Sequence, residues 1–303
     1  MEMEALKKHR QSNLIRDPIG VNKLKRRVKP LASLFFLALP LAIAGNSALP
    51  CLAAPSLYDD YSKKAKEYMD QRHSRFPEAE KFLRAALFQA KRFGTDDRRY
   101  RITLRDLAEL NYQKADFRDA IPLFNQSVIL SQRAVSRLKA KRANESEIAE
   151  ETRELVADLA DLADCYRGTS KFQQASTTYH KGLTLLDRLG KENTLQRAEL
   201  ESELADVYTV LGRYQEAEKL YEKSMARLAE KKNDPKVDKR SFEAVSIDTL
   251  QDYAMLLRST NRVKQGDELL SEMRKMLGLP DNPATIRDAH AFDEPKKLPE
   301  AGQ

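Results

Sequence analysis

The stretch AELESELADVYTVLGRYQEAEKLYEKSMARL, residues 198–228, decides the fold class of this chain. Its apolar residues recur at helical spacing on both sides of Gly212, which predicts two amphipathic helices joined by a turn. Glycine tolerates the positive φ that closes a helix, and the small residues Ala205 and Ala217 let the two helices approach closely. One hairpin cannot bury its apolar face alone, so we expect further copies of it in the chain.

The composition favours an all-helical protein. The chain has 303 residues, of which 41% are hydrophobic and 33% charged, with 10 Gly and no Trp. Its formal net charge is +7, but residues 1–30 hold nine Lys and Arg against three acidic residues, so the rest of the chain is nearly neutral. The basic character belongs to the N-terminal segment and gives no reason to expect a nucleic-acid partner.

The N-terminal segment has the pattern of an export signal. Residues 31–44, LASLFFLALPLAIA, carry no charge, directly follow the basic run KLKRRVKP, and precede small residues and turn formers. Fourteen helical residues span about 21 Å, less than the roughly 30 Å hydrocarbon core, so a cleaved signal is favoured over a retained anchor. We expect residues 1–54 to be this leader. The protein would then be periplasmic or extracellular, or anchored with its body outside the cytoplasm.

The two cysteines predict no internal disulfide. Cleavage after Ala53 would remove Cys51 and leave Cys165 as the single cysteine, although Ala44 and Ala48 also fit as cleavage points. Pro50 stands where a lipidation motif would need a small residue, which argues against lipid attachment at Cys51. Cys165 lies on an apolar helix face, so we expect a buried small hydrophobe and no reactive thiol.

The hairpin of residues 198–228 has relatives along the chain. Three further copies place a small residue and an aromatic or apolar residue before a turn, and a similar trio after it. An earlier copy keeps only its second helix in register. The corresponding residues are Leu107, Ala108, Tyr112, Phe117, Ala120 and Phe124; Leu162, Ala163, Tyr166, Phe172, Ala175 and Tyr179; Tyr253, Ala254, Leu257, Val263, Gly266 and Leu270; and, in the earlier copy, Phe76, Ala79, Leu83 and Ala86.

These positions resemble the tetratricopeptide repeat (TPR) family. The copy around Gly212 matches nearly every position, whereas Ser170 replaces the turn Gly and Gly266 replaces the packing Ala in other copies. Ala175 and Ala217 are 42 residues apart, which exceeds the standard repeat of about 34 residues and is similar to the long-helix kinesin light chain type. A longer interval after Ala120 predicts two extended helices that meet at Asn144, a good N-cap.

The resemblance implies the architecture and the domain organisation. We expect residues 55–279 to form an all-α, right-handed α-solenoid of about five TPR-like helix-turn-helix repeats. Residues 280–303 hold four prolines and few apolar residues, which predicts a disordered tail.

No pattern of catalytic or metal-ligating residues accompanies the repeats. The four histidines have no ligand partner at metal-binding spacing, and the chain lacks a Gly-rich phosphate loop and a nucleophile elbow. Asp158, Asp161 and Asp164 recur every three residues, which we interpret as a solvated helix face and not as a cation site. We therefore expect no enzyme activity, no metal and no cofactor.

The resemblance also implies a binding face. In TPR proteins the first helices line the inner face of the superhelix, and acidic residues occupy most of the corresponding positions in this chain. A face of that charge would attract a Lys/Arg-rich segment. The alternative is that these residues only solvate their helices. The acidic candidates are Asp106, Glu109, Asp161, Asp164, Glu199, Glu203, Asp206, Asp248 and Asp252; the other inner positions are Arg105, Tyr112, Arg167, Gln251 and Arg258.

The function expected from the sequence is that of a non-enzymatic, exported scaffold for protein–protein interaction. Its partner would be a protein or peptide, with Lys/Arg-rich segments as one candidate class and nucleic acid excluded. It would meet a membrane only through an uncleaved leader. Two alternatives stay open: a structural repeat protein that assembles with itself, and an enzyme whose site matches no known motif.

Overall fold

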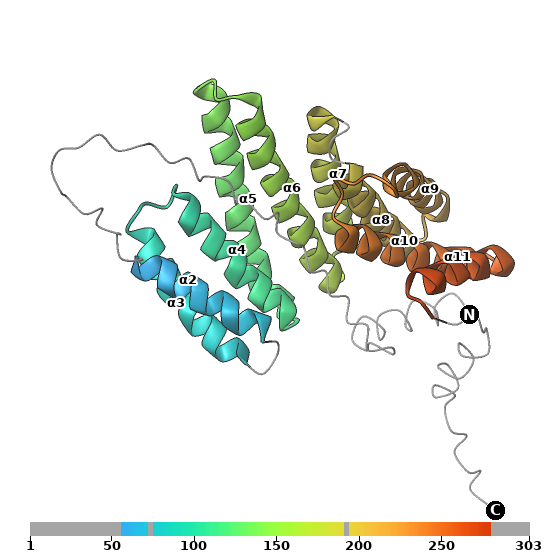
Figure 1. Ribbon diagram of the computed structural model, residues 1–303, viewed down its shortest axis with the longest axis horizontal. Coiled ribbons are helices and arrows are strands. Elements are labelled where there is room, and N and C mark those ends of the chain that lie inside the picture. Colours follow the sequence, from blue (N-terminus) through green and yellow to red (C-terminus); the bar gives the residue numbers. More distant parts are fainter. Residues whose placement is uncertain (1–55, 72–74, 191–193, 280–303) are drawn as a thin grey trace, which may run out of the picture. The chain divides into compact units, whose positions relative to one another are not determined.

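The computed structural model describes residues 56–71, 75–190 and 194–279, and all the regular structure in these ranges is α-helical. The predicted leader (1–54) and the predicted tail (280–303) lie outside the described residues. In chain order the helices are α2 (Leu57–Asp70), α3 (Phe76–Lys91), α4 (Arg98–Gln113), α5 (Phe117–Ala140), α6 (Glu145–Gly168), α7 (Phe172–Leu189), α8 (Thr194–Val210), α9 (Tyr214–Lys231), α10 (Lys239–Ser259) and α11 (Val263–Met276) (Figure 1).

The chain divides into two compact units. The larger unit spans Val28–Arg227, and its described part holds α2 to α8 and most of α9. The smaller unit includes Leu228–Gln303, and its described part holds the end of α9 together with α10 and α11.

The larger unit is a stack of helix hairpins. From α2 to α8 each helix packs against the next along the chain, and α4 also contacts α6 across the hairpin boundary. The Ser224 hydroxyl of α9 donates to the Ala198 carbonyl of α8 at 2.8 Å, which ties the next pair together. The smaller unit contains one such hairpin, in which α10 packs against α11. The predicted fold class, an all-α solenoid of helix-turn-helix repeats, is confirmed.

The same turn joins the two helices of four repeats. A residue with positive φ closes the first helix, at 60° for Ala115, 60° for Ser170, 76° for Gly212 and 63° for Asn261. The amide after each of them donates to the carbonyl five residues back, at 2.8 Å from Arg213 to Tyr208 and at 2.8–2.9 Å in the other three. Glycine, the residue best suited to positive φ, fills this position only once, so the turn depends on its hydrogen bonds more than on its residue type.

The hairpin of α5 and α6 is longer than its neighbours. Each of these helices has 24 residues, against 16 in α4. The side chain of Asn144 accepts a hydrogen bond from the Glu147 amide at 2.8 Å and begins α6, which confirms the predicted N-cap. The extra residues of this repeat therefore lengthen two regular helices and do not form a loop.

Buried alanines and one glycine hold the helices close together. Ala79, Ala120, Ala175 and Ala217 are fully buried, as their repeat positions predict. At Gly266 an added Cβ would lie 2.8 Å from the Ala254 carbonyl oxygen and 2.6 Å from Arg258 Cγ. The helices α10 and α11 are therefore too close for alanine, which explains why glycine replaces it in this repeat.

The first repeat is more regular than its sequence predicts. Its first helix, α2, begins at a capping box in which Ser56 and Asp59 bond each other's backbone amides. Ala65 is fully buried in this helix and packs with Leu83 of α3 and Leu107 of α4. Ala65 is thus the small packing residue of the first helix, although the aromatic residues around it in the sequence hide the repeat pattern.

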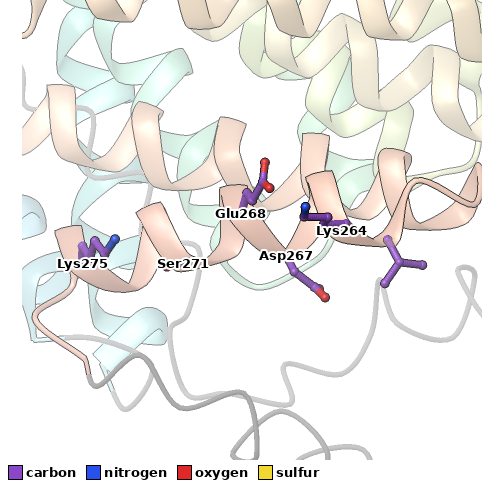
Figure 2. A pocket seen from close by; sticks show the side chains of 6 residues that line it. Lys264, Asp267, Glu268, Ser271 and Lys275 are labelled. Carbon is purple, nitrogen blue, oxygen red and sulfur yellow. The ribbon is translucent and has the colours of Figure 1, made fainter.

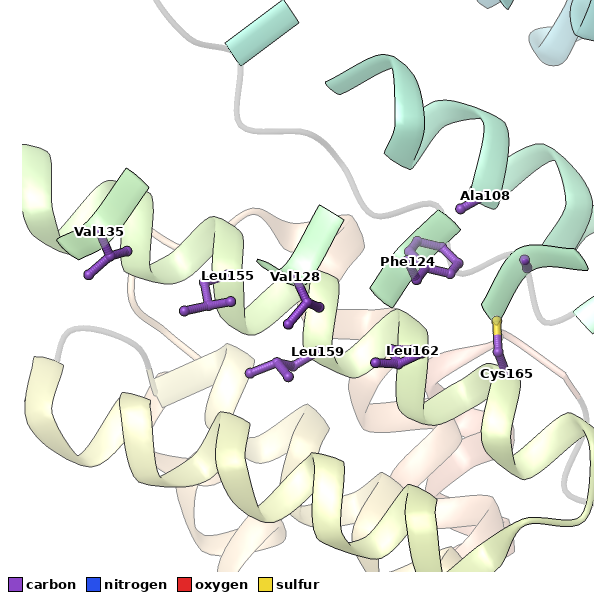
Figure 3. Close-up of a cluster of buried hydrophobic side chains, with 9 residues drawn as sticks. Ala108, Phe124, Val128, Val135, Leu155, Leu159, Leu162 and Cys165 are labelled. Atoms are coloured by element: carbon purple, nitrogen blue, oxygen red, sulfur yellow. The ribbon is translucent and has the colours of Figure 1, made fainter. Parts of the chain in front are cut away.

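A cluster of apolar side chains joins α4, α5 and α6 and includes the predicted buried cysteine. Figure 3 shows Ala108 of α4, Phe124 of α5 and Cys165 of α6 at one end of this cluster. Cys165 has no exposed surface, so the prediction of a buried small hydrophobe is confirmed. Burial, together with the carboxylates of Asp164, Asp161 and Glu109, raises the pKa of its thiol far above the ordinary range.

Within the described ranges, none of the helices combines the length and the hydropathy that a membrane span requires.

Candidate partner-binding face

The nine predicted acidic residues all lie on first helices of the hairpins. In the larger unit they lie on α4, α6 and α8, and in the smaller unit on α10. Three of them are buried: Asp106 is 5% exposed, Asp164 4% and Glu203 7%. The other six are half-buried: Glu109, Asp161, Glu199, Asp206, Asp248 and Asp252.

Arg167 of α6 brings three of these residues together. Its Nη1 lies 2.6 Å from Glu203 Oε2 and 3.0 Å from Asp206 Oδ2, both on α8, and its Nη2 lies 3.3 Å from Asp164 Oδ1. We call Arg167, Asp164, Glu203 and Asp206 the Arg167 cluster. It sets three carboxylates against one guanidinium and carries a formal charge of −2.

Burial makes the charges of the Arg167 cluster interact strongly. Arg167 is 8% exposed, and burial alone would lower its pKa. The carboxylates of Glu203, Asp164 and Asp206 outweigh burial, so the pKa of Arg167 lies well above its ordinary value. The guanidinium is therefore charged at every relevant pH and cross-links α6 to α8.

Asp164 has a second partner inside the fold. The hydroxyl of Tyr179, a fully buried residue of α7, donates a hydrogen bond to Asp164 Oδ1. Burial and the neighbouring Asp164 carboxylate raise the pKa of Tyr179 well above its usual value, so the hydroxyl keeps its proton. Asp164 thus connects α6 to α7 as well as to Arg167.

A second charged cluster joins α4 to α6. Arg101 of α4 is 5% exposed and contacts Glu151 and Glu154, with its Nη2 3.2 Å from Glu154 Oε2. One turn further along α4, Arg105 Nη1 lies 3.7 Å from Asp158 Oδ1. Glu151, Glu154 and Asp158 of α6 are therefore countered by arginines of the preceding first helix, in the same way that Arg167 of α6 counters acids of α8.

Asp158 corrects one interpretation of the sequence. Its side chain is 1% exposed and accepts hydrogen bonds from the hydroxyls of Ser127 at 2.8 Å and Ser131 at 2.7 Å, both on α5. The prediction that Asp158, Asp161 and Asp164 form a solvated helix face is wrong for Asp158 and Asp164. Carboxylates that accept several hydrogen bonds and pair with arginine can be buried between helices, which their spacing alone does not reveal.

The residues that sequence reasoning missed are the arginines. Arg105 and Arg167 occupied inner-face positions but were not recognised as partners of the acidic residues on the next first helix. Each arginine lies on the first helix one hairpin before its partner, Arg105 before Asp158 and Arg167 before Glu203. This relation can be recognised only when the stacking order of the hairpins is known.

The side chains that the structure describes do not form a metal site. In the described ranges no group of three His, Cys, Asp or Glu side chains is arranged to hold a metal ion. A shallow surface in the smaller unit is lined by residues of α11 alone, and Figure 2 shows Asp267 and Glu268 pointing to opposite sides of that helix. Since no second helix closes this surface, it provides no convergent polar groups.

One part of the chain matches a family model. Residues 153–232, which run from α6 through α9, match the family model of the tetratricopeptide repeat. No functionally curated protein matches the chain at a significant level.

Two solved structures share the fold along most of the chain. One is a variant of a protein from Podosopora anserina with nearly identical TPR-like repeats of the kinesin light chain type. It has a TM-score of 0.53 and 19% sequence identity over 75% of this chain and 95% of that chain. The other, BtubC (BKLC) from P. vanneervenii, has a TM-score of 0.53 and 16% identity over 82% of this chain and 97% of that chain. At these identities the likeness shows the fold alone, a TPR-like repeat fold that is typical of non-catalytic scaffolds for protein–protein interaction.

Proposed function

We propose that this chain is an exported, non-catalytic scaffold that binds a Lys/Arg-rich segment of another protein along the first helices α4, α6 and α8. The observation that carries the proposal is the surplus of carboxylates on α6 and α8. The Arg167 cluster alone carries a formal charge of −2, and half-buried acids flank it on the same helices. A concave surface of one sign concentrates ligands of the other sign.

The acids fall into two groups by burial, and the proposal gives each group its own role. Asp164 and Glu203 are buried and engaged by Arg167, so we assign them to the support of the face. Glu109, whose side chain accepts a bond from Gln113 at 2.9 Å, and Glu199 are half-buried and remain within reach of solvent. We therefore assign direct contact with the basic segment to Glu109, Asp161, Glu199 and the half-buried Asp206, all of which lie in the larger unit.

The test compares two pairs of isosteric substitutions in the full chain. The probe is a fluorescein-labelled dodecapeptide of alternating Lys and Ser, and its binding is followed by fluorescence anisotropy. The variant Glu109→Gln/Glu199→Gln should weaken binding by about two- to thirtyfold, since each lost charge pair is worth about 0.2–1 kcal/mol. The control Asp119→Asn/Glu222→Gln removes two exposed acids of the second helices α5 and α9 and should leave binding unchanged.

Equal binding by both variants would overturn the assignment of the face. Binding should also weaken as salt rises from 50 to about 300 mM, because screening shortens the range of surface charges. If the peptide binds neither the wild type nor the variants, the proposed partner class is wrong.

Export belongs to the same proposal and is supported by the basic and apolar pattern of residues 1–54. A C-terminally tagged chain should appear outside the cytoplasm, and its mature N-terminus should begin after residue 44, 48 or 53. Replacement of Leu37 and Leu39 by Lys should retain the uncleaved chain in the cytoplasm. Cytoplasmic recovery of the unaltered, full-length chain would contradict export.

A further inference from the structure

A hollow lies beside the start of α4, where this helix is shorter than the long hairpin of α5 and α6. Because α5 has 24 residues and α4 has 16, α5 extends past the start of α4 by about 12 Å at 1.5 Å per residue (Figure 1). The side chains of α5 that would pack against a longer α4 are left partly uncovered. The space at this place has a volume of about 260 Å³.

The floor of the hollow is apolar. It consists of Leu130, Ala134 and Leu138, which recur every four residues and so share one face of α5. Their burial decreases along the helix: Leu130 is 7% exposed, whereas Ala134 and Leu138 are half-buried. The floor is thus an extension of the hydrophobic core that none of the described helices of the larger unit completes.

The walls are predominantly cationic. Four of the lining residues are basic: Arg98 and Arg101 on α4, and Arg137 and Lys141 at the end of α5. Asp96 and Glu151 are the acidic residues among the lining residues.

The cations differ in how firmly they are held. Arg101 is 5% exposed, and its Nη1 donates to the Ser131 hydroxyl at 3.2 Å while Nη2 contacts Glu154, so its position is fixed. The side chain of Arg137 is 44% exposed, and it contacts Asp96 twice, with Nη1 3.2 Å from Oδ2 and Nη2 3.1 Å from the carbonyl oxygen; an exposed ion pair of this kind contributes little stability. Lys141 is exposed and, within the described part of the chain, forms no ion pair.

The geometry points to a docking site for a segment of another protein that presents a carboxylate next to an apolar side chain. The apolar side chain would fill the floor between Ala134 and Leu138, and the carboxylate would meet Lys141 and Arg137 at the rim. At about 260 Å³ the hollow lies below the roughly 300–1,000 Å³ of small-molecule clefts, which favours one anchoring side chain of a polypeptide over a whole small ligand. This site lies apart from the nine acidic residues and selects the opposite charge from the proposed inner face.

The test is a selection from a displayed library of random nonapeptides on the full-length chain, with charge reversal at the rim. The variant Arg137→Glu/Lys141→Glu changes two exposed residues that line the hollow. The matched control Arg133→Glu/Lys139→Glu makes the same change of charge on the same helix at exposed residues outside it. The wild type and the control should enrich peptides that combine Asp or Glu with an adjacent Leu, Ile or Phe, and the rim variant should not.

A synthesised peptide from the selection then separates the two parts of the site. By anisotropy, the rim variant should bind it at least about tenfold more weakly than the wild type. Replacement of the apolar residue of the peptide by Ser should cost a similar factor on the wild-type chain, and Leu138→Ser should weaken binding of the original peptide. The circular-dichroism melting of every variant is compared with that of the wild type, and the peptide substitution needs no protein variant at all.

Three outcomes would overturn the proposal: enrichment of the same acidic and apolar peptides by the rim variant, equal binding of the Ser-substituted peptide, or no such enrichment on the wild type. Enrichment of basic peptides alone would leave the hollow without a ligand and would instead support the proposed inner face. Loss of the basic-peptide binding described above leaves the present proposal intact, because the two sites share no residue.

Discussion

Arg167 Nη1 and Glu203 Oε2 lie 2.6 Å apart across the boundary between two repeats, with side chains 10% and 9% exposed. This pair joins α6 to α8 without the helix between them. If one of two such deeply buried charges is removed, the other stays buried without a partner, and the cost of its desolvation is no longer offset.

Removal of the cation of this pair should therefore destabilise the protein. Arg167→Met leaves Asp164, Glu203 and Asp206 facing one another and should lower the free energy of unfolding by about 3–5 kcal/mol. Urea unfolding of the full chain, followed by circular dichroism, measures the change. Arg84→Met, at an arginine 71% exposed whose partner is Glu80 on the same helix, should cost no more than about 0.5 kcal/mol. Similar losses in the two variants would contradict the role assigned to Arg167.

The contact between α10 and α11 should reject a methyl group at Gly266. Gly266→Ala places Cβ 2.8 Å from the Ala254 carbonyl oxygen, a backbone atom that cannot yield without moving a helix. We expect a loss of about 1–3 kcal/mol in the free energy of unfolding. Gly182→Ala is the control, because its Cβ would meet side-chain atoms and no backbone: Leu200 Cδ2 at 2.7 Å, the end of a side chain, and Val156 Cγ1 at an ordinary 3.8 Å. If Gly182→Ala proves the more harmful of the two, the explanation from backbone contact is wrong.

The non-glycine turns should gain stability from glycine. Ala115 and Ser170 both have φ of 60°, a conformation that costs an L-residue about 1–2 kcal/mol. Ala115→Gly and Ser170→Gly remove this strain, while the greater freedom of glycine in the unfolded chain offsets part of the gain, about 0.5–1 kcal/mol. Each variant should be more stable by up to about 1 kcal/mol in urea unfolding. Gly212→Ala should shift stability in the opposite direction, and a rise in its stability would refute the account.

The buried thiol predicts a pH dependence. Burial raises the pKa of Cys165 in the folded protein far above that of an unfolded cysteine, about 8.5. Above that pH the unfolded chain releases the proton and the folded chain does not, so stability falls by up to about 1.4 kcal/mol per pH unit. Urea unfolding at pH 7.5 and 9.5 measures this fall in a Cys51→Ser background, in which Cys165 is the single cysteine. Cys165→Ala in that background should remove this part of the dependence, and an unchanged slope would exclude the thiol as its cause.

The thiol should also resist modification. In the Cys51→Ser chain at pH 8, Ellman's reagent should react with Cys165 only after denaturant is added. Rapid reaction of the native chain would contradict its burial.

The repeats could be predicted from the sequence because their packing positions are local. Leu204, Ala205 and Tyr208 fall on one helix face whatever surrounds them, and Asn144 caps a helix through a neighbour three residues away. Similarly, the departure at Gly266 was visible in the sequence, although its cause, the closeness of Ala254, was not.

The charge partners could not be predicted in the same way. Whether an aspartate such as Asp158 is solvated or buried depends on side chains 27 to 31 residues away, the hydroxyls of Ser131 and Ser127. The pairing of Arg167 with Glu203 likewise depends on the register between two stacked hairpins. The half-buried acids Glu109 and Glu199 stay predictions for a binding face, and the binding experiment above decides their role.

The turn shared by Ala115, Ser170, Gly212 and Asn261 has a consequence for how such a chain can change in length. At each of these points two hydrogen bonds hold the backbone, irrespective of the side chain: the amide of the positive-φ residue donates to the carbonyl three residues back, and the next amide donates to the carbonyl five residues back. A duplication or deletion with its ends at two of these turns would rejoin the chain between equivalent bonds. The number of repeats can therefore increase or decrease by whole helix hairpins, because no new type of turn has to form between them.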